Sequence, residues 1–219
     1  MARRSGQNQG ATLREIRSAA FRLFGQHGFD GVSVLAVANS VGITKAALYW
    51  HYDGKQALYL DCYAELQSIF TERLFSGLQA GGDSRQQLLE FFIGIARLLE
   101  DERIRAGVAG YWMQPGSTEL PEARLARAQL EEHCSSQLAA LMQRAVDAEV
   151  LTTPLEVDEM ATTMMSFVEA LVLPFRSHTV AEIRRQVGIM AYTFLLAYEN
   201  GSALAEQALA FARGETAPI

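Results

Sequence analysis

Four residues between positions 45 and 50 have side chains that suit contact with the grooves and backbone of a nucleic acid. They are a cation, a small residue with a methyl group and two aromatic residues, namely Lys45, Ala46, Tyr49 and Trp50. If residues 45–52 form a helix, Leu48 and Tyr52 lie one turn apart on its buried side, and these four residues point away from the core. A recognition helix presents such an outward face to the major groove of DNA.

A pair of short helices joined by a glycine would position these residues. The apolar spacing predicts helices over residues 34–41 and 45–52. Gly42 between them tolerates the positive φ that the turn requires, and Ala38 is small where the second helix crosses the first. This arrangement is typical of a helix-turn-helix. On these residues alone, an ordinary helical hairpin within a bundle remains an alternative.

The residues that flank this pair favour the helix-turn-helix. Residues 16–58 read IRSAAFRLFGQHGFDGVSVLAVANSVGITKAALYWHYDGKQAL, and the segment resembles the DNA-binding domain of the tetracycline-repressor (TetR) family. The matching parts are residues 19–29, Ser33, and residues 41–45, 47–52 and 55–58. The resemblance covers about a fifth of the chain. Beyond it, only the length and the helical pattern agree with the family.

The resemblance implies two groups of DNA-contacting residues. It implies phosphate contacts from Ser33, Thr44, Tyr49, His51 and Lys55, and contacts to base edges or sugars from Lys45, Ala46, Ala47 and Trp50. The residue types agree, because hydroxyl groups and helix N-termini suit phosphate oxygens and alanine methyl groups can contact thymine. Ser33 and Thr44 are also expected to cap the two helices. The alternatives are core positions for Tyr49 and Trp50 and a packed position for His51.

The charge of the chain is distributed unevenly. The chain carries a net charge of −6, but residues 1–60 hold seven Lys or Arg and three Asp or Glu, a net charge of +4. The remaining residues therefore carry −10. Such asymmetry favours a nucleic-acid surface near the N-terminus of an otherwise acidic protein. We expect residues 1–11 to form a flexible basic arm.

The rest of the sequence has helical periodicity almost throughout. Helices are expected over residues 12–27, 53–76, 88–99, 104–113, 121–150, 156–173, 180–199 and 204–213. A capping box at Asp53 and Gln56 would open the second of these. The predicted fold is all-α, with a three-helix DNA-binding domain over residues 1–57. A larger helical domain for effector binding and dimerisation would follow over residues 58–219.

Two apolar helices near the end of the sequence predict an interface between two copies of the chain. Residues 187–198 are apolar nearly all round the helix, and such a helix has to be buried on every face. The expected interface residues are Met160, Met164, Phe167, Val168, Leu171, Phe175, Val187, Met190, Phe194 and Tyr198. A four-helix bundle between two copies is expected, as the resemblance also implies. Burial within one protomer is the alternative.

The resemblance also implies an effector pocket in the C-terminal domain. The candidate residues are Phe70, Phe92, Ile95, Leu99, Trp112, Met113, Leu138, Met142, Met165 and Glu169. Their Met and aromatic content suits an apolar or aromatic small molecule. Trp112 and the lone charge of Glu169 are the polar or gating candidates. Apolar stripes of this kind more often form a plain hydrophobic core than a ligand pocket.

Other kinds of protein and site have little support. No enzyme and no cofactor are expected, since the sequence has no nucleophile and base set, phosphate loop or metal cluster. Cys62 and Cys134 are too few for a disulfide framework and too distant for a CxxC metal site, and a redox role is disfavoured. No apolar run of about 20 residues and no secretory signal are recognisable, so a soluble cytoplasmic protein is expected.

Together these features predict a homodimeric, ligand-responsive transcription factor. In this interpretation it is a repressor that binds palindromic double-stranded DNA and leaves it when a small, largely apolar effector binds. No membrane partner is expected. A transcriptional activator of the same family, or a DNA-binding module without an effector, are the alternatives.

Overall fold

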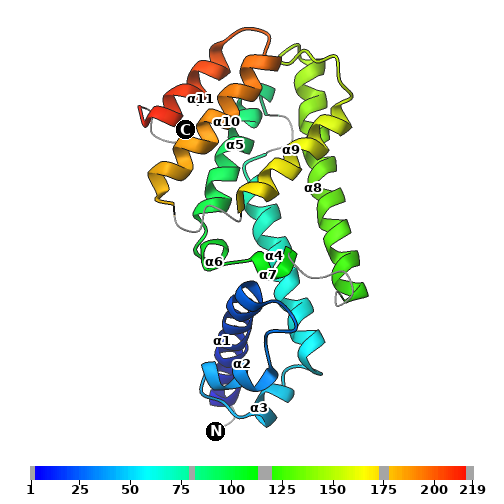
Figure 1. Cartoon of the computed structure of the whole chain (residues 1–219), viewed down its shortest axis with the longest axis vertical. Helices are drawn as coiled ribbons and strands as arrows, with labels where there is room; N and C mark the ends of the chain where they lie inside the picture. The colour runs from blue at the N-terminus through cyan, green and yellow to red at the C-terminus, as the bar shows by residue number, and fades with distance from the viewer. Residues whose placement is uncertain (1–2, 79–81, 113–119, 173–177, 216–219) are drawn as a thin grey trace. The chain divides into compact units, whose positions relative to one another are not determined.

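A computed structural model of the chain describes residues 3–78, 82–112, 120–172 and 178–215, with side chains from residue 13 onward. The described residues form helices and no strand (Figure 1), apart from one isolated bridge between Leu151 and Glu199. The prediction of an all-α fold is therefore confirmed.

Eleven helices are found in the described residues. They are α1 (Arg3–His27), α2 (Val34–Ser40), α3 (Lys45–Tyr49), α4 (Lys55–Phe75), α5 (Ser84–Glu100), α6 (Glu102–Arg105), α7 (Ala109–Trp112), α8 (Pro121–Asp147), α9 (Val157–Val172), α10 (Val180–Tyr198) and α11 (Ala203–Arg213). Helix α1 begins at Arg3, within the segment expected to be an arm. The segment holds no proline, and extending an existing helix costs less than nucleating one.

One predicted helix is divided in the structure. The helix expected over residues 104–113 is replaced by α6 and α7, which are separated at Gly107. Gly107 has a φ of 114°, which a helix cannot contain and which residues with a Cβ rarely adopt. The prediction of one continuous helix was wrong because apolar spacing does not reveal a single backbone reversal.

The chain forms two compact units. The first comprises Met1–Ser68 and Ala106–Arg127, and the second comprises Ile69–Arg105 and Ala128–Ile219. The first unit thus contains the predicted DNA-binding domain, and it also includes α7, which lies far along the sequence from α1. Each unit has its own set of buried apolar side chains.

A cluster of aromatic rings fills the first unit. The Tyr59 ring meets Phe24 edge-on at 5.0 Å between centroids and stacks on Tyr111 at 5.5 Å. The Tyr111 hydroxyl donates a hydrogen bond of 3.0 Å to the Phe21 carbonyl oxygen. These rings join α4, α7 and α1, which are distant in the sequence. Aromatic pairs of this geometry stabilise a core beyond the area that they bury.

Two glycines let α7 approach the backbone of α1. A Cβ at Gly110 would overlap the Phe24 carbonyl oxygen and lie 2.5 Å from the Gly28 nitrogen. A Cβ at Gly25 would overlap the Gly107 carbonyl oxygen. Helix α1 and the segment around α7 therefore touch main chain to main chain, which only glycine permits at these positions.

The second unit packs α10 against α5 and α11 (Figure 1). The buried side chains of α10 include Ile183, Val187, Ala191 and Leu195, spaced three or four residues apart. Gly188 faces α11 closely, since a Cβ there would lie 2.6 Å from the Ala212 Cβ. The same helix leaves Ile189 42% and Leu196 64% exposed, so it is not buried on every face within this chain.

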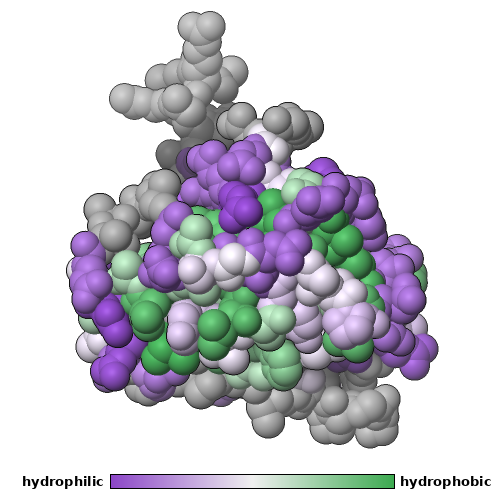
Figure 2. Space-filling model, turned by 90° about the horizontal axis from the view of Figure 1, so that it is seen from above, coloured by the Kyte–Doolittle hydropathy of each residue, from purple (hydrophilic) through white to green (hydrophobic). Residues whose placement is uncertain are grey.

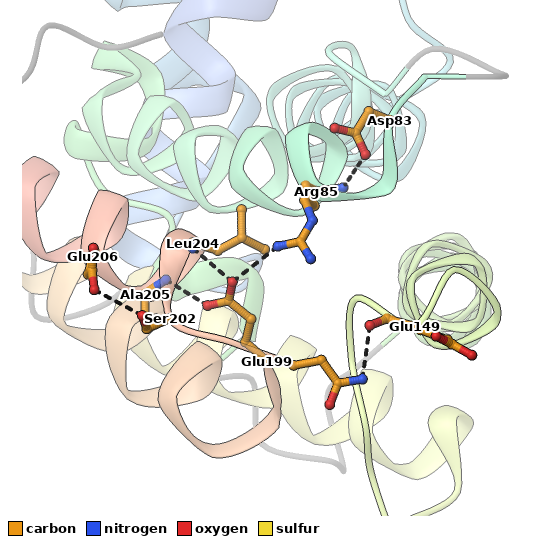
Figure 3. A network of polar contacts seen from close by, with 9 residues as sticks. Asp83, Arg85, Glu149, Glu199, Ser202, Leu204, Ala205 and Glu206 are labelled. Atoms are coloured by element: carbon orange, nitrogen blue, oxygen red, sulfur yellow. Dashed lines mark hydrogen bonds and ion pairs between the residues drawn. The ribbon is translucent and has the colours of Figure 1, made fainter.

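A buried carboxylate fixes the start of α11 in this unit. The Glu199 side chain is fully buried and accepts hydrogen bonds of 2.9 Å from the backbone nitrogens of Leu204 and Ala205 (Figure 3). Arg85 on α5 approaches the same carboxylate at 3.4 Å. The carboxylate satisfies N–H groups at the helix N-terminus, where the helix dipole also favours a negative charge.

A second buried carboxylate lies at the start of α6. Asp101 accepts hydrogen bonds from the Arg103 backbone and guanidinium and from Arg73, with an Arg73 ion pair of 3.0 Å. Burial alone would raise the pKa of Asp101, but the hydrogen bonds from Arg103 and Arg73 outweigh it and lower the pKa to about 2. Asp101 therefore stays ionised and holds the turn between α5 and α6.

Candidate nucleic-acid interface

Helices α2 and α3 form the turn that the sequence predicts. The Ser33 hydroxyl oxygen accepts a hydrogen bond of 3.0 Å from the Ala36 nitrogen, and the Thr44 hydroxyl oxygen accepts one of 3.1 Å from the Ala47 nitrogen. Gly42 between the helices has a φ of 70°. Both expected N-caps are thus present, and the glycine adopts the left-handed conformation that this turn requires.

Small and apolar side chains hold α3 against α2. Ala38 and Leu48 are fully buried, and the Ile43 nitrogen donates a hydrogen bond of 3.0 Å to the Ala38 carbonyl oxygen. Tyr52 is nearly buried, and its hydroxyl donates a hydrogen bond of 2.6 Å to Asp61 on α4. Burial, together with this hydrogen bond, raises the pKa of Tyr52 well above its usual value. The outward face of α3 is therefore set by contacts on its inner side.

The outward face of α3 carries the residues expected there. Trp50 is 88% exposed and Tyr49 is 46% exposed, so neither occupies a core position. Lys45 and Ala46 are also exposed, and the Lys45 ammonium lies 5.7 Å from the centroid of the Tyr49 ring. Helix α3 ends at Tyr49 rather than at residue 52, which leaves Trp50 just beyond its last residue.

Helix α4 begins beside this face with a lysine. Its first residue is Lys55, and Gly54, with a φ of 128°, occupies the N-cap position where Asp53 was expected. The Lys55 side chain is half-buried, and its ammonium lies 4.2 Å from the centroid of the Phe29 ring. His51 is also half-buried. The Phe29 ring is thus a partner of Lys55 that was not expected from the sequence.

The first unit brings all nine candidate residues for DNA contact to three neighbouring elements. Ser33, Thr44, Lys45, Ala46, Tyr49 and Trp50 are exposed, and Ala47, His51 and Lys55 are half-buried. They lie at the N-terminus of α2, along and just beyond α3, and at the N-terminus of α4. Leu35 on α2 is 51% exposed and was not predicted. Its position off the apolar stripe of α2 was the available signal.

Most of the predicted effector residues lie in the core of the second unit. The buried members are Phe70, Phe92, Ile95, Leu99, Leu138, Met142 and Met165, while Glu169 is half-buried. Trp112 is half-buried and belongs to the first unit, and Met113 lies outside the described residues. None of these candidate residues lines any of four hollows found among the described residues. The effector pocket therefore remains a prediction.

The predicted interface residues divide into inner and outer groups. Met160, Met164, Val168 and Val187 are buried within the unit, and Leu171, Met190, Phe194 and Tyr198 are half-buried. Phe167 is 56% exposed, and Phe175 lies outside the described residues. Phe167, Phe194 and Tyr198 line a hollow of about 250 Å³ between α9 and α10, together with Leu155, Met160, Met164 and the polar Glu159 and Thr163. An apolar surface therefore remains on the two helices.

The two cysteines are buried in different units. Burial raises the pKa of the Cys134 thiol to about 12, with Glu169 adding to the effect, and burial also raises that of Cys62. Neither thiol is activated as a nucleophile. Among the described residues, no group of three or more His, Cys, Asp or Glu is arranged to hold a metal ion. No described helix is both long and apolar enough to cross a membrane.

Comparison with known proteins finds a family model that matches the segment containing this interface. The family model of bacterial regulatory proteins, tetR family, matches residues 16–62. The "Probable acrEF/envCD operon repressor" of Escherichia coli (strain K12) is 30% identical over 96 residues, which are 42% of this chain and 43% of that protein. The chain thus spans less than half the length of the curated relatives that it matches first.

Solved structures share the fold over nearly the whole chain. A gamma-butyrolactone receptor (ArpA-like protein) has a TM-score of 0.68 and 22% identity, covering 95% of this chain and 99% of that one. A protein of Saccharomonospora viridis, described as a transcriptional regulator and solved in complex with choline, has a TM-score of 0.65 and 18% identity. The match covers 83% of this chain and 95% of that protein's chain. At these identities the likeness shows the fold.

Proposed function

This chain belongs to the TetR family of bacterial regulatory proteins, and from that premise we propose that it is a ligand-responsive regulator that binds operator DNA as a homodimer. The observation that carries the proposal is the outward face of α3. It exposes Lys45, Tyr49 and Trp50 between the capped N-terminus of α2 and the lysine that opens α4. Lysine and tyrosine side chains are among those that contact phosphate oxygens, and exposed large aromatic residues mark interaction surfaces.

The proposed contacts follow from the chemistry of each position. The backbone N–H groups at the N-termini of α2 and α3 suit phosphate oxygens, and Lys55 adds a cation nearby. Ala46 and Ala47 offer methyl groups to thymine, and Lys45 can donate to guanine. Phosphate contacts orient the unit on the duplex, while the contacts from α3 read the sequence.

A second copy of the chain would bring two such units to one palindrome. A single recognition helix reads few base pairs, so paired half-sites supply specificity. We propose that α9 and α10 pair with the same helices of the second copy, covering Phe167 and the hollow beside it. Figure 2 shows hydrophobic side chains at the surface of the molecule as seen from above, between hydrophilic ones.

Sedimentation of two matched variants tests the proposed pairing. Phe167→Glu puts a charge into the interface and is expected to yield monomers. Leu125→Glu changes a residue that is similarly exposed, at 60%, on α8 and should leave the dimer intact. A Phe167→Glu protein that still sediments as a dimer would contradict an interface at α9 and α10.

Selection of DNA from a random-sequence pool tests the DNA-binding function. The wild-type protein is expected to enrich a palindromic duplex, called here the selected duplex. Tyr49→Ala and Lys55→Ala should weaken binding to it, and Lys55→Ala should lower the slope of log K against log salt by about 1. Arg213→Ala removes an exposed cation from α11 as the control and should change neither. Failure to enrich any duplex would overturn the proposed function.

We further propose that a small, largely apolar molecule releases the DNA. The apolar core of the second unit and the gamma-butyrolactone named for one structural neighbour support this class, whereas the choline named for the other is a small cation. An effector shifts the equilibrium between DNA-binding and released conformers only as far as it binds one of them better. Repression, as named for the Escherichia coli relative, is the proposed outcome of DNA binding.

A thermal-shift screen tests for an effector. The panel would hold lactones, quaternary ammonium compounds and aromatic compounds, and one class is expected to raise the melting temperature by several degrees. The same class should dissociate the selected duplex. If no class did either, the alternative of a DNA-binding module without an effector would replace this part of the proposal.

A further inference from the structure

Lys55 occupies an electrostatically unfavourable position. It is the first residue of α4, where the helix dipole is positive, and the first turn of this helix has no acidic residue. No described carboxylate lies within ion-pair distance of its ammonium. A lysine there would be expected to extend freely into water, because its side chain is long and strongly hydrated.

The Phe29 ring meets this ammonium instead. The Lys55 Nζ lies 4.2 Å from the ring centroid, well within the range of a cation–π contact. The negative face of the ring offsets the positive end of the helix. Phe29 lies in the turn between α1 and α2, so the contact joins that turn to the start of α4.

Two buried rings fix the orientation of Phe29. The Phe24 ring stacks on it at 6.3 Å, and the Tyr59 ring meets it edge-on at 5.2 Å. Both are almost fully buried. Tyr59 also lies one turn after Lys55 on α4, on the same side of the helix. The ring that holds the ammonium is therefore itself held from α1 and α4.

The other lysine of the chain provides a contrast. Lys45 and Lys55 are the only lysines, and Lys45 lies 5.7 Å from the Tyr49 ring on its own short helix. Tyr49 is 46% exposed and is itself a proposed phosphate contact. That ring has no comparable support, so it cannot place the Lys45 ammonium as the Phe29 ring places that of Lys55.

We propose that Phe29 is a positioning residue for DNA binding, whose ring holds the Lys55 ammonium where it meets a phosphate. This inference rests on the proposed function. The free lysine side chain would lose rotamer freedom on binding, and the ring removes part of that loss in advance. Phe29 thereby strengthens DNA binding without touching the DNA.

A double-mutant cycle on the selected duplex tests the role. Phe29→Leu keeps an apolar side chain but removes the ring, and is expected to weaken binding about threefold, as an intermediate cation–π contact would. Phe29→Tyr keeps a ring and should bind like the wild type. In Lys55→Met, which has no cation to position, the added Phe29→Leu should cause no further loss. A further threefold loss in the double variant would overturn the proposal.

Lysine NMR tests the contact itself, whether or not DNA is bound. With 13C-labelled lysine only two side chains give signals. The ε-methylene protons of Lys55 should be shifted upfield by the ring in the wild type and return to ordinary positions in Phe29→Leu, while those of Lys45 stay unchanged. Unchanged Lys55 signals would overturn the proposal.

The two experiments separate this inference from the proposed function. If the wild type enriched no duplex, both would fail together. If the wild type bound and Lys55→Met lowered the salt slope, but Phe29→Leu acted equally in both backgrounds, only the role of Phe29 would fail. The proposed function would then stand with Lys55 as an independently placed cation.

Discussion

The two units of this chain differ in what they leave exposed and in what holds them together. The first unit exposes Lys45 and Tyr49 on a short helix and Trp50 just beyond it, and it is held by aromatic rings and by main-chain contact at glycines. The second unit exposes apolar residues such as Phe167 and buries the carboxylates of Asp101 and Glu199 at helix starts. The kinds of residue that are exposed and that hold the fold together therefore differ between the two units.

This difference explains why the sequence of the first unit indicates a function, whereas the sequence of the second unit does not. A surface that contacts DNA needs particular groups at particular helix ends, so a Thr44 or a Lys55 carries information by itself. An apolar core or interface needs only volume and burial, which many residues supply. The second unit thus specifies its fold while its ligand and partner stay unspecified.

The largest expected effect concerns the glycine contacts of the first unit. Gly110→Ala would push a Cβ into the Phe24 carbonyl oxygen and should destabilise the first unit by about 3 kcal/mol. Both tryptophans, Trp50 and Trp112, belong to this unit. Urea unfolding followed by tryptophan fluorescence is therefore expected to shift more than unfolding followed by far-UV circular dichroism.

Gly42→Ala is the matched control for this prediction. A Cβ there would have no heavy atom within 4 Å, so the only cost is the φ of 70°, about 1 kcal/mol. Equal losses in the two variants would mean that the approach of α7 to α1 contributes nothing beyond backbone strain.

The sequence predicts most of the helices because their apolar faces are continuous. Helix α10, for example, covers the apolar run expected over residues 180–199, and Val187, Ala191 and Leu195 on it are buried. The division at Gly107 was missed because a single residue with positive φ leaves no trace in hydrophobic spacing. The early start of α1 was missed because residues 3–11 have no apolar residues at helical spacing, so hydrophobic periodicity gives no signal there.

The local structure of the candidate interface was predicted more fully than its tertiary contacts or the effector pocket. Caps at Ser33 and Thr44 depend on local hydrogen bonds between residues three apart, which a sequence displays directly. The partner of Lys55 was missed because Phe29 lies 26 positions earlier, and only tertiary packing brings the two together. The effector residues could not be ranked, since a pocket and a core use the same apolar side chains.

The next largest effect concerns the buried carboxylate of the second unit. Glu199→Gln removes the charge that accepts hydrogen bonds from the start of α11 and meets Arg85, and should cost about 2 kcal/mol. Urea unfolding followed by far-UV circular dichroism measures the loss of stability. The unfolding curve followed by tryptophan fluorescence should shift less, because both tryptophans belong to the first unit. Glu206→Gln changes an exposed carboxylate in the first turn of α11 and is expected to alter the free energy of unfolding by no more than about 0.5 kcal/mol. A similar loss in both variants would contradict the expectation that the buried carboxylate of Glu199 stabilises the second unit more than an exposed one does.

The smallest effect is the loss of a stabilising contribution of Asp101 in acid, in the second unit. The pKa of Asp101 is lowered to about 2, below its ordinary value of 3.8, so its ionised form stabilises the folded state at higher pH. That contribution is complete above about pH 5 and is lost progressively as the pH falls through 3.8 and 2 toward about 1. It should amount to about 1 kcal/mol, because water screens the arginines, which are more than a third exposed. Asp101→Asn should therefore be less stable than the wild type at neutral pH, with the gap closing in acid.

The exposed ion pairs of the first unit provide the comparison for this pH dependence. Arg17 lies 3.9 Å from Asp61 and 3.8 Å from Glu65, and it is 40% exposed. Arg17→Gln should change the free energy of unfolding by less than about 0.5 kcal/mol, because exposed pairs of this length contribute little. If Arg17→Gln cost as much as Asp101→Asn at neutral pH, burial would not be what makes the carboxylates of the second unit stabilising. The two units would then differ in their exposed surfaces alone.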